Sequence, residues 1–187
     1  MSLRPVRVLG DPILRRRAAP VSTITDEIRR LADDLYETMY AAKGIGLAAP
    51  QVGVAERLFV TDVDGAKFVM INPEIVRVEA PMEVGEEGCL SIPEIMGDVK
   101  RPGRVVMSAL DLTGEPITVE AGGMLARCFQ HELDHLDGRL FIDRLSFLKR
   151  RRALAEWEKY EKDFPGLVRI LTPGDPGDPD RGHSEEL

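Results

Sequence analysis

The segment from residue 130 to 138 constrains this chain more than any other, because it contains the pattern His-Glu-x-x-His. In an α-helix, residues four apart lie on the same face, so His131 and His135 can bind one metal ion together. Glu132 then lies beside the ion without ligating it, which is the position of a general base acting on water. We therefore expect a helix that carries a catalytic metal site. The alternative is two surface histidines on a charged helix.

Glycines flank this segment and indicate where the helix begins and ends. Gly122 and Gly123 precede it, and Gly138 follows it, as is typical of a helix that starts after a glycine break and ends at a C′ glycine. The residues that recur at helical spacing are Leu125, Cys128, Phe129, Glu132 and Leu136. Because this stripe is mostly apolar, we expect a buried or half-buried helix that directs the acid inward.

Two histidines need a third ligand, since catalytic zinc-type sites usually have three protein ligands and one position open to water. Cys128 shares the helix, but its separation from His135 corresponds to about 10.5 Å of helical rise. Acids on the following predicted helix are a second possibility: Glu156, Glu158 and Glu161. We favour Cys89, because the glycines before it allow a strand or loop to lie close against the helix. As a purely structural residue, Cys89 would be a small buried apolar side chain.

Composition limits the class of protein. The 187 residues are most simply one domain, and a net charge of −7 argues against general nucleic-acid binding. Two cysteines make no disulfide framework. The N-terminus lacks the apolar region of a secretory signal, and no apolar run approaches the roughly 20 residues that span a bilayer. We expect a cytoplasmic protein with no membrane segment and no specific nucleic-acid partner.

Hydrophobic periodicity predicts the elements around the motif helix. Thr25 is the expected N-cap of a helix that Gly44 closes, and residues 57 to 121 read as strands joined by turns at 64–65 and 113–114. The expected strands cover residues 57–62, 67–71, 74–79, 83–91, 104–111 and 116–120. Residues 1–24 look irregular, and residues 44–51 are too rich in glycine, alanine and proline for a regular element.

The C-terminal quarter contributes three further expectations. Residues 141–142 could add a short strand, and Ser146 caps a helix from residue 147 to about 164. Residues 166–187 then read as a disordered tail, which makes His183 a poor ligand.

The predicted fold is α+β, with mostly antiparallel β-sheets packed around a central helix carrying the motif, plus a C-terminal helix, in one catalytic domain over residues 1–165.

Three stretches in this order resemble the motifs of peptide deformylases: residues 44–51 (GIGLAAPQ), 87–91 (EGCLS) and 130–135 (QHELDH). The resemblance covers residues 1–165. It implies a metal-dependent hydrolase that removes the N-formyl group from the initiator methionine of newly made polypeptides and releases formate. The ligands that it implies are Cys89, His131 and His135. Their ion would be Fe²⁺ in vivo, with Zn²⁺, Ni²⁺ or Co²⁺ possible in preparations.

The resemblance also assigns roles around the metal. Glu132 takes the proton of the attacking water and passes it to the leaving amine, while the Leu90 backbone N–H and the Gln51 amide stabilise the oxyanion. The substrate-binding residues that it implies are the backbone of Ile45, Gly46 and Gly88 and a methionine-sized pocket lined by Gly44, Leu125 and Cys128. The partners are N-formylmethionyl nascent peptides, and we expect a monomer.

Three other interpretations of the residues stay open. One is a zinc metallopeptidase with a glutamate at 156, 158 or 161 as third ligand. A second is a metal-stabilised binding module without catalysis. Finally, the basic run at residues 149–152, although typical of a solvated face, would suit weak, salt-dependent association with the ribosome.

Overall fold

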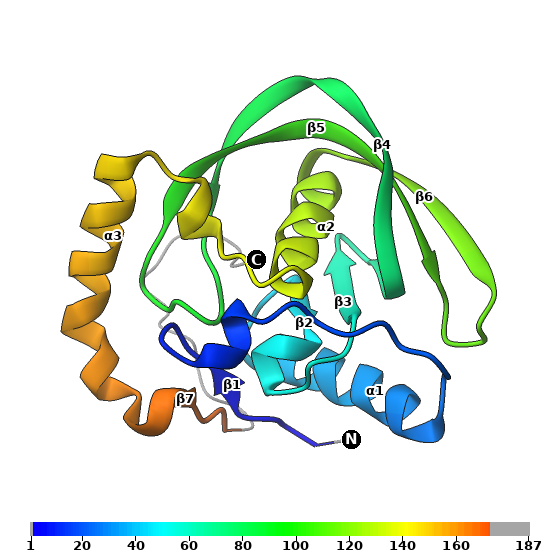
Figure 1. The fold of residues 1–187 in the computed structure, drawn as a ribbon, viewed down its shortest axis with the longest axis horizontal. Helices are drawn as coiled ribbons and strands as arrows, with labels where there is room; N and C mark the ends of the chain where they lie inside the picture. Colours follow the sequence, from blue (N-terminus) through cyan, green and yellow to red (C-terminus); the bar gives the residue numbers. More distant parts are fainter. Residues whose placement is uncertain (1, 173–187) are drawn as a thin grey trace.

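Helix α2 (Gly123–Leu136) lies at the centre of the computed structural model, which describes residues 2–172 (Figure 1). The chain enters the helix from an extended Gly122, and Gly138 follows it with a φ of 72°, in the left-handed region that closes a helix. Cys128, Phe129 and Glu132 are among its buried residues. The predicted bounds of the motif helix and its inward-facing acid are therefore confirmed.

A five-stranded antiparallel sheet curves over this helix, so the chain has the expected α+β fold. Its strand order is β2-β3-β4-β5-β6, and in Figure 1 β4 and β5 arch above α2. The strands are β2 (Gly46–Ala48), β3 (Leu58–Val63), β4 (Ala66–Glu87), β5 (Gly97–Leu110) and β6 (Pro116–Gly122). Within residues 2–172, β2 pairs with β3 alone and therefore forms one edge of the sheet.

β4 is a single strand of 22 residues where the sequence predicts three separate strands. Its pairing with β5 shifts register between Ile71 and Glu74 and again between Glu79 and Met82. Pro73 and Pro81 fall in these two intervals. Because proline cannot donate to the ladder, it reads as a break in the sequence, whereas here the strand continues through bulges.

Two other local predictions are wrong. Residues 141–142 belong to a 3-10 helix, Phe141–Arg144, in which the Asp143 carboxylate accepts the Leu140 N–H at 2.9 Å and closes a tight turn. Residues 44–51, expected to be irregular, contain the edge strand β2 followed by a 3-10 helix, Ala49–Val52. Pairing with β3 gives the small-residue segment its regular form, which local composition does not reveal.

Helix α1 (Asp26–Ala41) packs against β2 and β3, and helix α3 (Phe147–Tyr160) lies to one side of the sheet (Figure 1). Ser146 caps α3 as predicted, since its hydroxyl accepts the Lys149 N–H. Beyond α3, strand β7 (Val168–Arg169) pairs with β1 (Val6–Arg7). Residues 166–172 thus belong to the folded part and not to a tail, while residues 173–187, including His183, lie outside the described residues. Among the described residues, none of the helices is long and apolar enough to cross a membrane.

Candidate metal centre and active site

Cys89, His131 and His135 meet at one buried point between the end of β4 and α2. The Sγ of Cys89 lies 3.3 Å from the Nε2 of His135, and the Nε2 atoms of His135 and His131 lie 3.2 Å apart. All three ligand atoms fall within 4.8 Å of one another. The helix supplies two of them one turn apart, and the segment after β4 supplies the sulfur, an arrangement that matches three ligands around a single ion.

The imidazole of His131 is oriented by Glu87. The Nδ1 of His131 lies 3.1 Å from Glu87 Oε2, and Arg101 donates to both oxygens of the same carboxylate, at 2.6 and 2.8 Å. Burial alone would raise the pKa of Glu87, but hydrogen bonds and charges from Arg101 and His131 hold it far below its usual value. An ionised carboxylate only accepts, so the Nδ1 of His131 donates to it, and Nε2 is the ring nitrogen that faces His135.

Burial keeps the ring of His135 neutral. Burial lowers its pKa well below the usual value, and the neighbouring His131 adds to this effect. A neutral imidazole is the form that binds metal. The two buried rings and the cysteine sulfur form a donor set suited to zinc, iron(II), cobalt or nickel. We take this fit as the structural basis for assigning a divalent ion to the three residues.

Glu132 lies beside this cluster with an unsatisfied carboxyl group. Both of its oxygens are buried, and neither has a hydrogen-bond partner among residues 2–172. Burial raises the pKa of the carboxyl well above its usual value. A buried carboxyl without a partner is costly unless a reactant supplies one, and a raised pKa suits a group that must both take and return a proton.

Gly46 allows Glu132 to occupy this position. A Cβ atom on Gly46 would clash with Glu132 Oε1 and would lie 2.8 Å from the Sγ of Cys128. The edge strand therefore lies directly against the acid, with no side chain between them. A bulkier residue at position 46 would displace the carboxyl group.

The free edge of β2 presents the backbone of Gly46. Asp62 donates its N–H to the Ile45 carbonyl at 2.9 Å, so residue 45 bonds toward β3 and the next residue, Gly46, bonds away from it. The Gly46 N–H and C=O therefore face the open edge, as strand addition of a peptide requires. The Ile45 carbonyl is engaged within the sheet, and the Ile45 side chain packs instead with Val63 and Cys128.

Gln51 has a fixed orientation. Its Oε1 accepts the Ala48 N–H at 2.8 Å, which directs the amide nitrogen toward the Cys89 sulfur at 3.7 Å and the Ser91 hydroxyl at 3.3 Å. The donor side of Gln51 thus faces the metal cluster. Leu90 follows Cys89 directly in the chain and is fully buried.

Two of the predicted pocket residues, Leu125 and Cys128, lie near the acid, and the third, Gly44, lies against Leu90. Leu125 packs against the cluster of Ile45, Val63 and Cys128, and Cys128 lies one turn before Glu132 on α2. Burial raises the pKa of the Cys128 thiol well above its usual value, so this cysteine is a neutral apolar lining group. Gly44 and Leu90 touch closely, since a Cβ on Gly44 would lie 2.8 Å from Leu90 Cδ1. Gly88 is buried directly before Cys89.

The other candidate ligands lie elsewhere. Among the described residues, the three-residue cluster above is the only group of histidine, cysteine or acidic side chains with metal-site spacing, and it contains none of the alternatives. Glu156 on α3 pairs with Lys159 at 2.6 Å and lines a cavity of about 440 Å³ between α3 and β5. The geometry therefore favours Cys89 over the glutamates at 156, 158 and 161 as third ligand.

Sequence reasoning missed the charged side chains behind the cluster. They are Glu87, Arg101, Arg127 and Asp134, all buried and joined by ion pairs. In the sequence Glu87 and Arg101 resemble the many exposed charges of β4 and β5, because alternation alone does not say which charges have buried partners. The position of Arg127, four residues before His131, was the one available signal.

Comparison with known proteins points to one family. Residues 3–151 match the family model described as polypeptide deformylase. The chain is 53% identical over 163 residues to a peptide deformylase of Alkalilimnicola ehrlichii, covering 85% of this chain and 91% of that protein. A solved peptide deformylase of Legionella pneumophila superposes with a TM-score of 0.82 at 43% identity, covering 86% of this chain and 96% of that one. A Synechococcus elongatus peptide deformylase, solved in complex with actinonin, gives 0.78 at 47% identity, with coverage of 82% and 85%.

Proposed function

The chain belongs to the polypeptide deformylase family, and we propose that it removes the N-formyl group from nascent peptides with Glu132 as general base and acid. In this proposal Glu132 acts beside a divalent ion, which is held by Cys89, His131 and His135. The observation that carries the proposal is the convergence of these three ligands within 4.8 Å next to a buried, unpartnered carboxyl. When bound, such an ion lowers the pKa of water and polarises a carbonyl oxygen.

Glu132 supplies the proton transfers in this proposal. It takes a proton from the water that attacks the formyl carbon, and it returns that proton to the nitrogen of methionine as the C–N bond breaks. The products are formate and a peptide with a free amino terminus. Because Glu132 has a raised pKa, it holds the proton between the two steps without a large energetic penalty.

Gln51 and Leu90 stabilise the charge that develops on the formyl oxygen. The Gln51 amide nitrogen already faces the cluster because the Ala48 N–H fixes the other end of the amide. Leu90 follows the ligand Cys89 directly, so its backbone N–H is carried by the same rigid segment. Donors that are oriented before the reaction require no reorganisation in the transition state.

The substrate lies along the open edge of β2 in this account. Gly46 offers one N–H and one C=O to an extended peptide, and Gly88 offers backbone groups on the opposite side of that peptide. The first side chain of the peptide enters the apolar space around Leu125 and Cys128, and Gly44 lies beside this space. Backbone pairing does not depend on side chains. We therefore expect selectivity for the first residue and tolerance for those that follow.

The ion is Fe²⁺ in vivo in our proposal, with Zn²⁺, Ni²⁺ or Co²⁺ able to replace it. We further propose that the enzyme acts as a monomer in the cytoplasm. Its catalytic domain takes up residues 1–165 and the segment up to residue 172 packs onto it.

Formate release from a formyl-methionyl peptide tests the proposal, with the unformylated peptide as the control for background. Glu132→Gln should retain fold and metal but lose turnover by about 100- to 10,000-fold. A variant that keeps wild-type turnover would contradict the assigned base, and metal without any formate release would favour a non-catalytic module.

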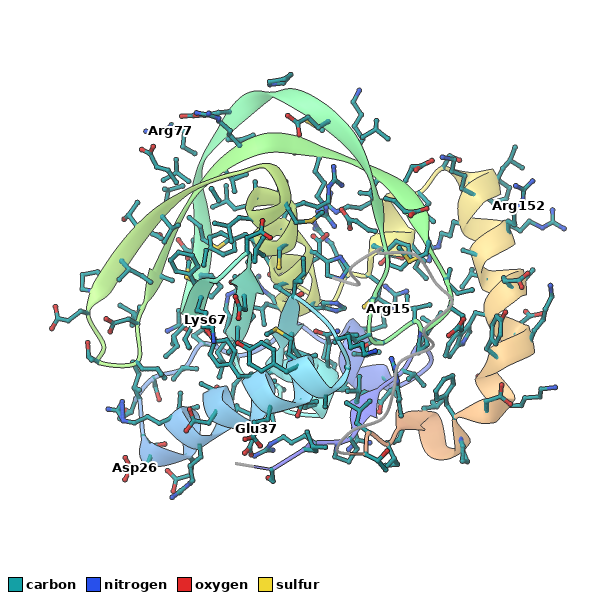
Figure 2. All side chains as sticks on the ribbon, turned by 180° about the vertical axis from the view of Figure 1, so that it is seen from behind. Arg15, Asp26, Glu37, Lys67, Arg77 and Arg152 are labelled. Atoms are coloured by element: carbon teal, nitrogen blue, oxygen red, sulfur yellow. The ribbon has the colours of Figure 1, made fainter. Side chains whose placement is uncertain are left out.

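A weak association with the ribosome is a second proposal, carried by residues 149–152. Lys149 pairs with Asp98 at 2.9 Å and Arg150 with Asp143 at 3.1 Å, whereas Arg152 projects outward from α3 (Figure 2). Charge reversal of residues 149–152 should reduce co-sedimentation with ribosomes at low salt. Unchanged co-sedimentation would contradict it.

A further inference from the structure

The guanidinium of Arg127 ties the metal-site helix to the strands that lead to Cys89. Arg127 lies on α2, one turn before His131, and is only 8% exposed. Its Nη1 donates to Glu87 Oε1 at 2.7 Å and to the Val99 carbonyl at 3.0 Å, and its Nη2 donates to the Glu83 carbonyl at 3.2 Å. One side chain of α2 therefore contacts both β4 and β5 just before β4 ends.

Gly85 makes room for this guanidinium. A Cβ on Gly85 would lie 2.8 Å from Cζ and Nη2 of Arg127 and 2.9 Å from its Nε. The guanidinium thus lies directly against the strand backbone. The φ of Gly85 is outside the left-handed region, so the backbone conformation itself would accept alanine, and only the contact with Arg127 would not.

Glu87 joins this contact to the proposed metal ligands. It receives hydrogen bonds from Arg127, from Arg101 and from the ring of His131, and Arg101 also donates to Asp134 of α2 at 2.9 Å. Glu87 lies two residues before Cys89. A shift of the Arg127 guanidinium would therefore move Glu87, and with it both the ring of His131 and the segment that carries the sulfur.

We propose that Arg127 and Gly85 act as a coupled pair of positioning residues that set the distance between Cys89 and the two histidines, and so the affinity of the site for its ion. This inference rests on the proposed metal centre. Its physical basis is that metal–ligand distances must be held within about 0.2 Å, while the sulfur and the rings come from two separate elements. The hydrogen bonds of Arg127 join these elements. Groups behind metal ligands commonly contribute about 10- to 100-fold to metal affinity.

A mutant cycle with cobalt(II) tests the pair. Cobalt affinity is measured by competition with a chelator, and the thiolate-to-cobalt charge-transfer absorption reports the bond to Cys89. Arg127→Met and Gly85→Ala should each lower affinity by about 10- to 100-fold and weaken that absorption. Arg127→Lys should recover only part of the affinity, because an ammonium lacks the planar fork that spans several acceptors. Gly85→Ala should cost little further affinity in the Arg127→Met background, since the clashing group is gone.

Arg57→Met is the matched control. Arg57 is another largely buried arginine that ties α2 to the sheet, donating to Asp137 at 2.8 Å and to the Pro73 carbonyl at 3.4 Å. Its loss should lower the melting temperature and leave cobalt affinity unchanged. This control separates positioning of the metal site from a general loss of packing around the helix.

The outcomes are distinct. Folded Arg127→Met and Gly85→Ala proteins that bind cobalt with wild-type affinity and absorption would overturn the inference while leaving the proposed function intact. If Arg127→Met fails to fold, Gly85→Ala decides alone, since it changes no charge. Absence of a thiolate absorption in the wild-type protein would instead contradict the proposed metal centre itself.

Discussion

A side chain at position 46 would occupy the space that the carboxyl group of Glu132 fills, so strand β2 and the proposed general base are fitted to each other. Gly46→Ala should displace the acid from the attacking water and lower kcat about 100-fold, the cost of a misplacement near 1 Å. Steady-state formate release checks this. Metal content should not change, because the atoms nearest to such a Cβ belong to Glu132 and Cys128 and not to the three ligands.

Gly122→Ala is the glycine control for that experiment. A Cβ there would meet nothing closer than 3.7 Å, and the φ of −132° suits alanine. Wild-type kcat in Gly46→Ala, or an equal loss in both variants, would contradict the fitted contact.

Gln51→Glu should lower kcat by about 100- to 1000-fold, because a carboxylate can still accept the Ala48 N–H but has no donor for the developing oxyanion. The measurement is kcat together with metal content in the same samples. Loss of metal rather than of turnover would show that Gln51 supports the ligand Cys89 and not the transition state.

The buried carboxylate of Glu87 should make the free energy of unfolding depend on pH. Its pKa is depressed in the folded protein, so its contribution is complete above its usual value of 4.5 and is lost as the pH falls below that value. Glu87→Gln should lower the free energy of unfolding by roughly 3 kcal/mol at pH 7, since it leaves the buried guanidinium of Arg127 without a carboxylate and Arg101 with Asp134 as its remaining carboxylate. Urea denaturation with chelator present, repeated between pH 7 and 3, should show the two proteins converging at low pH. A constant difference over that range would contradict the account.

The iron(II) form should be inactivated by peroxide, because a thiolate-bound iron site offers an oxidisable metal and an oxidisable ligand. Cobalt- or nickel-loaded protein should keep its activity under the same treatment. The check is formate release before and after exposure, with reductant added afterwards. A zinc form with full and stable activity, prepared without iron, would contradict iron as the working ion.

Local sequence information was sufficient for the elements whose ends have clear chemistry. Thr25 occupies the N-cap position of α1, although its side chain makes no capping hydrogen bond. Ser146 caps α3 and Gly138 closes α2, as expected from capping rules. The strand β4 was divided in three because Pro73 and Pro81 disrupt pairing locally, while the bulges that absorb them depend on the partner strand. The pairing of β1 with β7 joins the two ends of the fold, which no local pattern indicates.

The site residues, too, fall into those that local sequence predicts and those that depend on the tertiary structure. Spacing on one helix is enough to predict His131, Glu132 and His135, but a ligand on another element, Cys89, was only one of several candidates from the residues alone. The charges behind the ligands were not predictable, because the burial of Arg101 depends on how the sheet curves over α2. The close contacts of Gly46 with Glu132 and of Gly85 with Arg127 were not predictable either, because they join residues that are far apart in the sequence.

The most direct test of the account is the metal content of two cysteine variants purified side by side. Cys89 and Cys128 are both fully buried, and Cys128 even shares α2 with the two histidines, but of the two cysteines only Cys89 lies in their cluster. Metal analysis should find about one ion per chain in the wild type and in Cys128→Ala, and almost none in folded Cys89→Ala, with formate release lost in parallel. A Cys89→Ala protein that retains its ion and its turnover would contradict the central claim.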